Sequence, residues 1–164
     1  MKKSLIVLAL AAGCSASGQP QGSENGSGDG SGGEGGSGGA RDPLTGLYQA
    51  GGGTHPSQMC ILRKTGRAQF GITLWSPGLR ACSGAGTVAL SGDRVTLAMA
   101  GDSPCTIEAK LKDGVMTFPG SVPPTCAYYC GSGASFAGAT LTRRGATRAD
   151  ALEAKDPAGE PLCG

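Results

Sequence analysis

The stretch Cys126–Phe136 (CAYYCGSGASF) holds the residue types whose spacing is best suited to chemistry in this chain. Its two cysteines are four positions apart, Tyr128 and Tyr129 lie between them, and Ser132 and Ser135 follow among small residues. Four kinds of site have this composition: a metal clip, a redox pair, a nucleophile loop, and two disulfides beneath a binding loop.

A metal clip and a redox pair both fit the surrounding sequence poorly. Structural zinc takes four ligands, usually from two close cysteine or histidine pairs, but no second close pair is present and His55 is the only histidine. Redox motifs have two residues between their cysteines, whereas Cys126 and Cys130 have three. We therefore expect no metal and no cofactor.

A catalytic nucleophile is also poorly supported. Residues 133–137 partly match the Gly-x-Ser-x-Gly pattern around Ser135, but they end in alanine and do not follow a strand-to-helix elbow. His55 precedes Pro56 in a glycine-rich loop, a setting typical of a solvated histidine rather than a general base. We expect no enzyme, and a hydrolase using His55 and Ser135 is the alternative.

The beginning of the chain has the layout of an export signal. Lys2 and Lys3 precede an apolar stretch of eight residues, Leu5–Ala12, which is too short to span a bilayer but has the length of a signal-peptide core. The alternatives here are an ordinary secretory signal, with an incidental cysteine after it, and a lipoprotein signal.

Residues Leu10–Cys14 (LAAGC) resemble the bacterial lipobox. The resemblance implies that residues 1–13 are removed and that the Cys14 thiol carries diacylglycerol. Since Ser15 rather than aspartate follows the cysteine, it also implies sorting to the outer membrane in bacteria with two membranes.

We expect residues 14–40 to form a lipidated N-terminus and a Gly/Ser-rich tether. The segment contains no basic or aromatic residue, so it cannot bury enough apolar surface to offset the entropy of ordering. The remaining residues 41–164 have the length of one domain. Their charges are scattered and form no basic stripe with interleaved aromatics, so we expect no nucleic-acid partner.

The cysteine count is consistent with a lipidated and disulfide-bonded chain. Seven cysteines are present, and if Cys14 carries lipid an even number remains for three disulfides, although 15 connectivities are open. Proximity across the Asp113-Gly114 hairpin favours a Cys105–Cys126 bridge, and the need to pin the C-terminal tail favours a Cys130–Cys163 bridge. The six cysteines available for disulfides are Cys60, Cys82, Cys105, Cys126, Cys130 and Cys163.

Short segments of alternating polarity, separated by turn signals, predict a mainly β fold. We expect a small antiparallel up-and-down barrel or meander, stapled by disulfides, with a short C-terminal helix. The expected strands are 46–50, 58–63, 67–75, 81–90, 94–100, 105–111, 115–118 and 136–143, and the expected helix is 147–155.

Several short stretches between residues 44 and 143 together resemble the Inh-type bacterial metalloprotease inhibitors and their outer-membrane lipoprotein relatives. That resemblance implies an eight-stranded antiparallel barrel with a disulfide from the second strand to a cysteine about twenty residues later, here Cys60–Cys82. The stretches are GLY at 46–48, CIL at 60–62, FGI at 70–72, GDRVTL at 92–97, FAG at 136–138 and LTR at 141–143.

A shorter stretch, residues 131–136 (GSGASF), is similar to a loop of the inhibitors of C-type lysozyme. In that family a serine and a basic residue reach the catalytic carboxylates of the lysozyme. Here Ser135 stands at the position of the basic residue.

The sequence therefore predicts a lipid-anchored protein of the bacterial cell envelope that acts as a binding or inhibitor module, in its most specific form a protease inhibitor. Its expected partners are the membrane, through the lipid, and a secreted or periplasmic protease or another protein. The alternatives are a structural envelope lipoprotein without a dedicated target and a lysozyme-inhibitor-like protein. The expected binding loop comprises Tyr128, Tyr129, Ser132 and Ser135.

Overall fold

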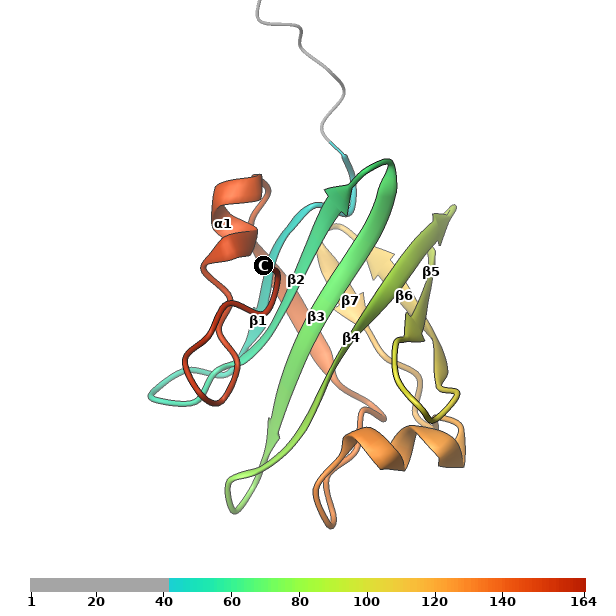
Figure 1. Ribbon diagram of the computed structural model, residues 1–164, viewed down its shortest axis with the longest axis vertical. Helices are drawn as coiled ribbons and strands as arrows, with labels where there is room; N and C mark the ends of the chain where they lie inside the picture. Colours follow the sequence, from blue (N-terminus) through green and yellow to red (C-terminus); the bar gives the residue numbers. More distant parts are fainter. Residues whose placement is uncertain (1–41) are drawn as a thin grey trace, which may run out of the picture. The chain divides into compact units, whose positions relative to one another are not determined.

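The computed structural model describes residues 42–164, which form a closed antiparallel barrel of eight strands in sequence order (Figure 1). This confirms the predicted mainly β, up-and-down barrel with a short helix near the C-terminus. The elements are β1 (Gly46–Ala50), β2 (Ser57–Lys64), β3 (Arg67–Ser76), β4 (Arg80–Ser91), β5 (Arg94–Met99), β6 (Thr106–Lys112), β7 (Val115–Thr117), the 3-10 helix η1 (Pro124–Tyr129), β8 (Thr140–Gly145) and α1 (Arg148–Leu152).

Two hairpins owe their tightness to residues with positive φ. Thr65-Gly66 joins β2 to β3 with φ angles of 47° and 83°, and Asp113-Gly114 joins β6 to β7 with 50° and 77°. Positive φ at both central residues defines the type I′ turn, whose twist matches that of the flanking strands. The predicted Asp-Gly hairpin is thus present.

The barrel interior is a packed core. Alternate residues of each strand point inward, and the side chains of Tyr48, Phe70 and Ile107 at its centre are at most 2% exposed. Phe136 joins them from the loop before β8, with its ring 6.5 Å from that of Phe118. The interior therefore leaves little room for a ligand.

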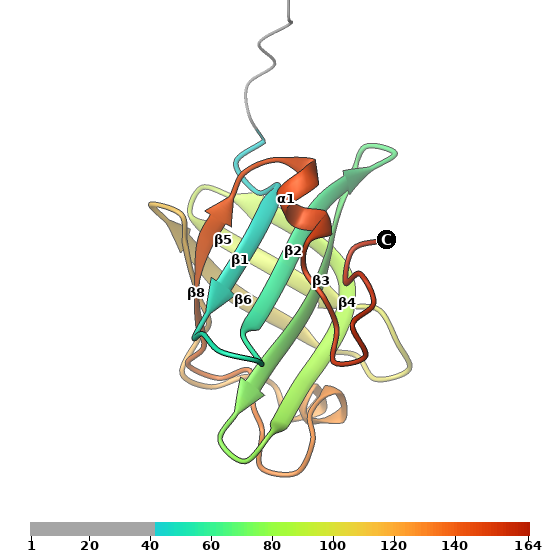
Figure 2. The same ribbon diagram turned by 90° about the vertical axis from the view of Figure 1, so that its left-hand side faces the viewer.

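A second, smaller core lies on the outer face of β1 and β2. Leu47, Cys60 and Leu62 point out of the barrel, and Ala151 and Ala154 of the C-terminal segment cover them. Figure 2 shows α1 lying across the upper part of β1 and β2. Both cores are built from residues 44–163.

The C-terminal segment also approaches β3 closely. The carbonyl oxygen of Leu162 lies where a side chain at Gly71 would project, so this position requires glycine. The backbone N–H of Lys155 donates to Gln58 Oε1 over 2.9 Å. The tail thus contacts the barrel wall at Lys155 and at Leu162, and residues 157–161 between them are exposed.

All six cysteines of the described chain form disulfides, but only one predicted pairing is confirmed. Cys105–Cys126 is present. Cys60 bonds to Cys163 rather than to Cys82, and Cys130 bonds to Cys82 rather than to Cys163.

The pleat of the sheet explains the two errors. Cys60 points out of the barrel into the outer core, whereas Cys82 points inward and belongs to the barrel core. Successive side chains of a strand alternate between the two faces of a sheet, so the barrel wall separates the two thiols. The tail is pinned as predicted, but it is pinned to β2.

The last strand and the helix are shorter than predicted. β8 begins at Thr140 rather than at residue 136, because Phe136 turns into the core and Gly138 adopts a φ of 71°. The helix begins one residue after Thr147, which forms a capping box with Asp150, and it ends at Leu152. The hydrogen bonds from Thr147 lower the pKa of Asp150 and favour its charged form at this position.

The predicted signal peptide, the lipidation site Cys14 and the tether lie outside the described residues. Within residues 42–164, no helix has the length and hydrophobicity needed to cross a bilayer.

We predict that the Cys60–Cys163 bridge contributes more to stability than the Cys105–Cys126 bridge, because it joins residues 103 positions apart while Cys105–Cys126 joins residues 21 apart. Replacing both cysteines of a bridge by alanine should cost about 2–5 kcal/mol of unfolding free energy, more for the longer loop. Urea denaturation of the two double variants measures this order. A smaller loss for the Cys60/Cys163 variant would contradict it.

Candidate functional site at the loop end

The two ends of the barrel differ in their connections. At one end, three two-residue turns join β2 to β3, β4 to β5 and β6 to β7. At the other lie all the longer connections, residues 51–56, 77–79, 100–105 and 118–139, which we call the loop end (bottom of Figure 1). Because binding residues are concentrated in loops held by a rigid scaffold, the loop end is the candidate site.

Two disulfides fasten η1 to the sheet at the loop end. Cys126, which is fully buried, bonds to Cys105 just before β6, and Cys130 bonds to Cys82 in β4. The N–H of Gly131 then donates to the Ala81 oxygen over 2.8 Å. The stretch is therefore a pair of disulfides beneath a loop, with both partners in or beside the sheet.

The two tyrosines of this stretch have different surroundings. The hydroxyl of Tyr129 donates to the Ser103 oxygen over 2.7 Å, and its ring lies against Gly84 and Gly101. Tyr128 meets the Tyr129 ring edge-on, with 5.2 Å between ring centroids, and its side chain is 64% exposed. Tyr129 thus supports the loop end, and Tyr128 is available for contact.

The predicted loop after Cys130 is compact and exposed. Its turn closes with a 2.9 Å bond from the Ala134 N–H to the Gly131 oxygen, and Ser132 and Ser135 are both exposed. The Ser135 hydroxyl accepts from the Ala137 N–H over 3.0 Å. The loop is therefore ordered by its own hydrogen bonds.

Sequence reasoning missed the neighbouring β3–β4 hairpin tip as a candidate. Leu79 is 70% exposed and has a φ of 59°, a left-handed conformation that is uncommon for leucine. Arg80 donates from Nε to the Pro77 oxygen over 3.3 Å. In the sequence, Pro77-Gly78 signals a turn, and Leu79 directly after it is the exposed apolar residue of the tip.

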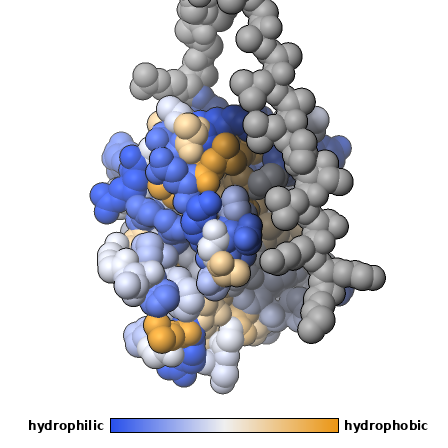
Figure 3. All heavy atoms as spheres, turned by 60° about the vertical axis from the view of Figure 1, so that its left-hand side comes forward, coloured by the Kyte–Doolittle hydropathy of each residue, from blue (hydrophilic) through white to orange (hydrophobic). Residues whose placement is uncertain are grey.

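The hairpin tip and the loop lie side by side. A Cβ atom built on Gly133 would be 2.7 Å from an Nη atom of Arg80, so the guanidinium group lies against the loop. A hollow of about 280 Å³ between the two segments is lined by Trp75, Pro77 and Ser135. A space-filling view shows a small hydrophobic spot near the lower tip of the molecule (Figure 3).

His55 and Ser135, the residues considered for catalysis, interact with different partners rather than with each other. The His55 ring packs against Trp75, with 4.8 Å between centroids, and the Ser135 hydroxyl bonds to its own loop. No group of three or more His, Cys, Asp or Glu side chains within residues 42–164 is arranged to hold a metal ion.

Comparison of the chain with protein-family models, with curated proteins and with solved structures finds no match. The functional interpretation of the loop end therefore depends on its own geometry.

We predict that removing the Cys82–Cys130 bridge loosens the loop. In a Cys82→Ala/Cys130→Ala variant, residues 131–135 lose their covalent tie to β4 and should become the first site of cleavage by a nonspecific protease. Mass spectrometry of limited digests identifies that site. The Cys60→Ala/Cys163→Ala variant is the control, and its loop should keep the wild-type resistance; equal cleavage in both would refute the prediction.

Proposed function

We propose that this chain is a lipid-anchored protein of the bacterial cell envelope whose barrel is a binding or inhibitor module that contacts a protein target through the loop end. One observation carries the proposal. The two large apolar side chains that are most exposed in residues 42–164, Leu79 and Tyr128, both lie at the loop end.

Rigidity favours tight contact at this end. Cys82–Cys130 and Cys105–Cys126 hold η1 against the sheet, and the β3–β4 hairpin is the longest of the barrel. Binding then requires little further ordering of side chains and loops, which otherwise costs roughly 0.5–1.5 kcal/mol per immobilised side chain. Burial of an exposed leucine contributes about 1.5–3 kcal/mol, and tyrosine is enriched among the residues that dominate binding energy.

The shape of the hairpin tip favours the inhibitor form of the proposal. The tip presents a single apolar side chain, Leu79, on a narrow two-stranded support that extends beyond the barrel wall (Figure 1). A protease binds substrate in a cleft with pockets for individual side chains. A projecting, pre-ordered leucine suits such a pocket, and the Arg80 guanidinium beside it suits an acidic rim.

Lipid anchoring is supported by sequence alone. The basic residues Lys2 and Lys3, the short apolar stretch and the lipobox-like residues before Cys14 together favour processing as a lipoprotein. Several acyl chains on one N-terminus suffice for stable membrane attachment, since each buried methylene contributes about 0.8 kcal/mol.

Inhibition of C-type lysozyme is a second candidate, favoured by the position of Arg80. The loop at residues 131–136 lacks a basic residue, but the Arg80 guanidinium lies against Gly133 and supplies a positive charge from the neighbouring hairpin. Ser132, Ser135 and Arg80 would then face the two carboxylates of a lysozyme together.

The unlipidated chain 15–164 should inhibit at least one enzyme in a panel of secreted metallo- and serine proteases and C-type lysozymes. Leu79→Asp, which removes the apolar tip, should weaken protease inhibition at least tenfold. Arg80→Ala should weaken lysozyme inhibition by a larger factor than it weakens protease inhibition. Inhibition constants from steady-state assays measure both effects.

Lys110→Ala is the matched control, because Lys110 is an exposed residue of β6 away from the loop end. This variant should inhibit like the wild type. If micromolar protein leaves every enzyme of the panel unaffected, the inhibitor form is wrong. A structural envelope role then gains support if deletion of the gene changes envelope permeability.

Cells that express the full chain should incorporate radioactive palmitate into it, and Cys14→Ala should abolish the label because that thiol is the proposed acceptor. Fractionation should move the variant from the membrane to the soluble fraction. Label that persists in Cys14→Ala would place the lipid elsewhere.

A further inference from the structure

The barrel wall is incomplete where β3 and β4 separate. Their ladder ends at the pair Gln69–Thr87, although β4 continues to Ser91. β4 keeps its pairing with β5 as far as Ser91–Arg94. Residues 88–91 therefore have a strand neighbour on one side only among the residues that the structure describes.

The backbone groups that face the gap follow from the alternation of the sheet. The Ala100 N–H donates to the Ala85 oxygen over 2.8 Å, so Ala85 directs its backbone groups toward β5. Successive residues of a strand direct these groups to opposite sides. Val88 and Leu90 therefore direct theirs toward β3. The pair Gln69–Thr87 already joins the Val88 N–H to the Ala68 oxygen, so the Val88 oxygen and both backbone groups of Leu90 face the gap.

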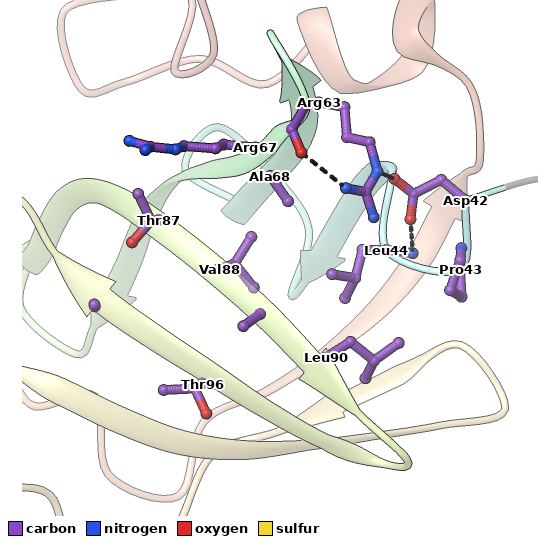
Figure 4. A pocket seen from close by; sticks show the side chains of 13 residues that line it. Asp42, Pro43, Leu44, Arg63, Arg67, Ala68, Thr87, Val88, Leu90 and Thr96 are labelled. Atoms are coloured by element: carbon purple, nitrogen blue, oxygen red, sulfur yellow. Dashed lines mark hydrogen bonds and ion pairs between the residues drawn. The ribbon is translucent and has the colours of Figure 1, made fainter.

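A pocket of about 630 Å³ occupies this gap, and we call it the notch (Figure 4). Its floor is apolar and consists of Leu44, Ala68, Val88 and Leu90. In Figure 4 the β2–β3 hairpin borders one side, the β4–β5 hairpin borders the other, and the segment at Asp42 crosses one end.

The rim of the notch is basic. Arg63 forms a 2.6 Å ion pair with Asp42. Burial disfavours the charge on Asp42, but the Leu44 N–H and Arg63 outweigh burial and lower its pKa, so the pair persists at neutral pH. Arg67, on the same rim, is exposed and makes no ion pair within residues 42–164.

We propose that the notch binds a short extended segment of a partner protein, which adds to the edge of β4 as a strand. A strand of four residues spans about 13 Å and matches the free stretch of β4. Its backbone would pair with the Val88 oxygen and with both backbone groups of Leu90, alternate apolar side chains would rest on the notch floor, and an acidic side chain would meet Arg67. Main-chain hydrogen bonds supply affinity in such additions, and the side-chain pockets supply specificity.

This site is independent of the loop end, because the β2–β3 and β4–β5 turns that border the notch lie at the opposite end of the barrel. An envelope protein with both sites would connect two partners. A negative test of one site would leave the proposal for the other site standing.

The test begins with a displayed library of random seven-residue peptides, panned against immobilised chain 15–164. We expect enriched peptides in which apolar residues alternate with acidic or polar ones. On saturation with a synthetic copy of an enriched peptide, hydrogen exchange of the Leu90 amide should slow at least tenfold.

Backbone methylation then distinguishes strand addition from other binding. N-methylation of the peptide at alternate amides should weaken binding at least tenfold for the set that faces β4 and less than twofold for the other set. Arg67→Glu should weaken binding of an acidic peptide at least fivefold, and a peptide with lysine in place of the acid should recover it. Lys110→Glu, an exposed cation outside the notch, is the matched control.

Three results would overturn the proposal. One is that no peptide binds more tightly than about 100 µM. Another is that bound peptides leave the Leu90 amide unprotected, or bind equally well with either set of amides methylated. The last is that sedimentation shows a dimer whose formation protects this same amide, because the occupant is then a second copy of this chain.

Discussion

Strand β2 buries side chains on both of its faces, because Met59 and Ile61 point into the barrel while Cys60 and Leu62 point out of it. The barrel can cover only the inner set. The outer set needs the C-terminal segment, so Cys60 pairs with the tail and Cys82 is left for Cys130. The attachment of η1, and with it the loop end, thus depends on what covers the outside of β2.

The length of β4 accounts for both candidate sites. It pairs with β3 from Arg80 to Thr87 and with β5 from Gly86 to Ser91, so its two ladders overlap only in the middle. In the part of β4 that pairs with β3 alone, Cys130 bonds to Cys82 at the edge of β4 that faces away from β3. There the β3–β4 hairpin extends from the barrel. Where β4 runs with β5 alone, the wall opens as the notch. One strand longer than its neighbours therefore gives the molecule a projecting tip at one end and an open edge at the other.

Local patterns made most of the fold predictable from the sequence. Alternation along Arg94–Met99, and the Asp113-Gly114 turn, involve residues within a few positions of one another, and their strands and hairpin were placed correctly. The errors concern relations across the chain. Which face Cys60 occupies is decided by the tail a hundred residues later, and Phe136 leaves the strand pattern because the core has a place for it beside Phe118.

The candidate sites were less predictable for the same reason. The sequence located the exposed loop around Ser132 and Ser135, but not the Arg80 side chain that lies against it, because that contact joins two hairpins. The notch has no local signature, since strand pairing shows a gap only when the ladders on both sides of β4 are known.

The three disulfides are nested: Cys105–Cys126 lies within Cys82–Cys130, which lies within Cys60–Cys163. In an exported chain, Cys60 and Cys82 are the first two thiols of the domain to meet an oxidase. Joining cysteines in order of appearance would link these two, which is not a native pair. Correct maturation then requires either that oxidation waits for most of the chain or that a thiol attacks the early bridge and exchanges it. A cell that oxidises this chain as it emerges therefore needs disulfide isomerase activity as well as an oxidant, whereas delayed oxidation removes that need.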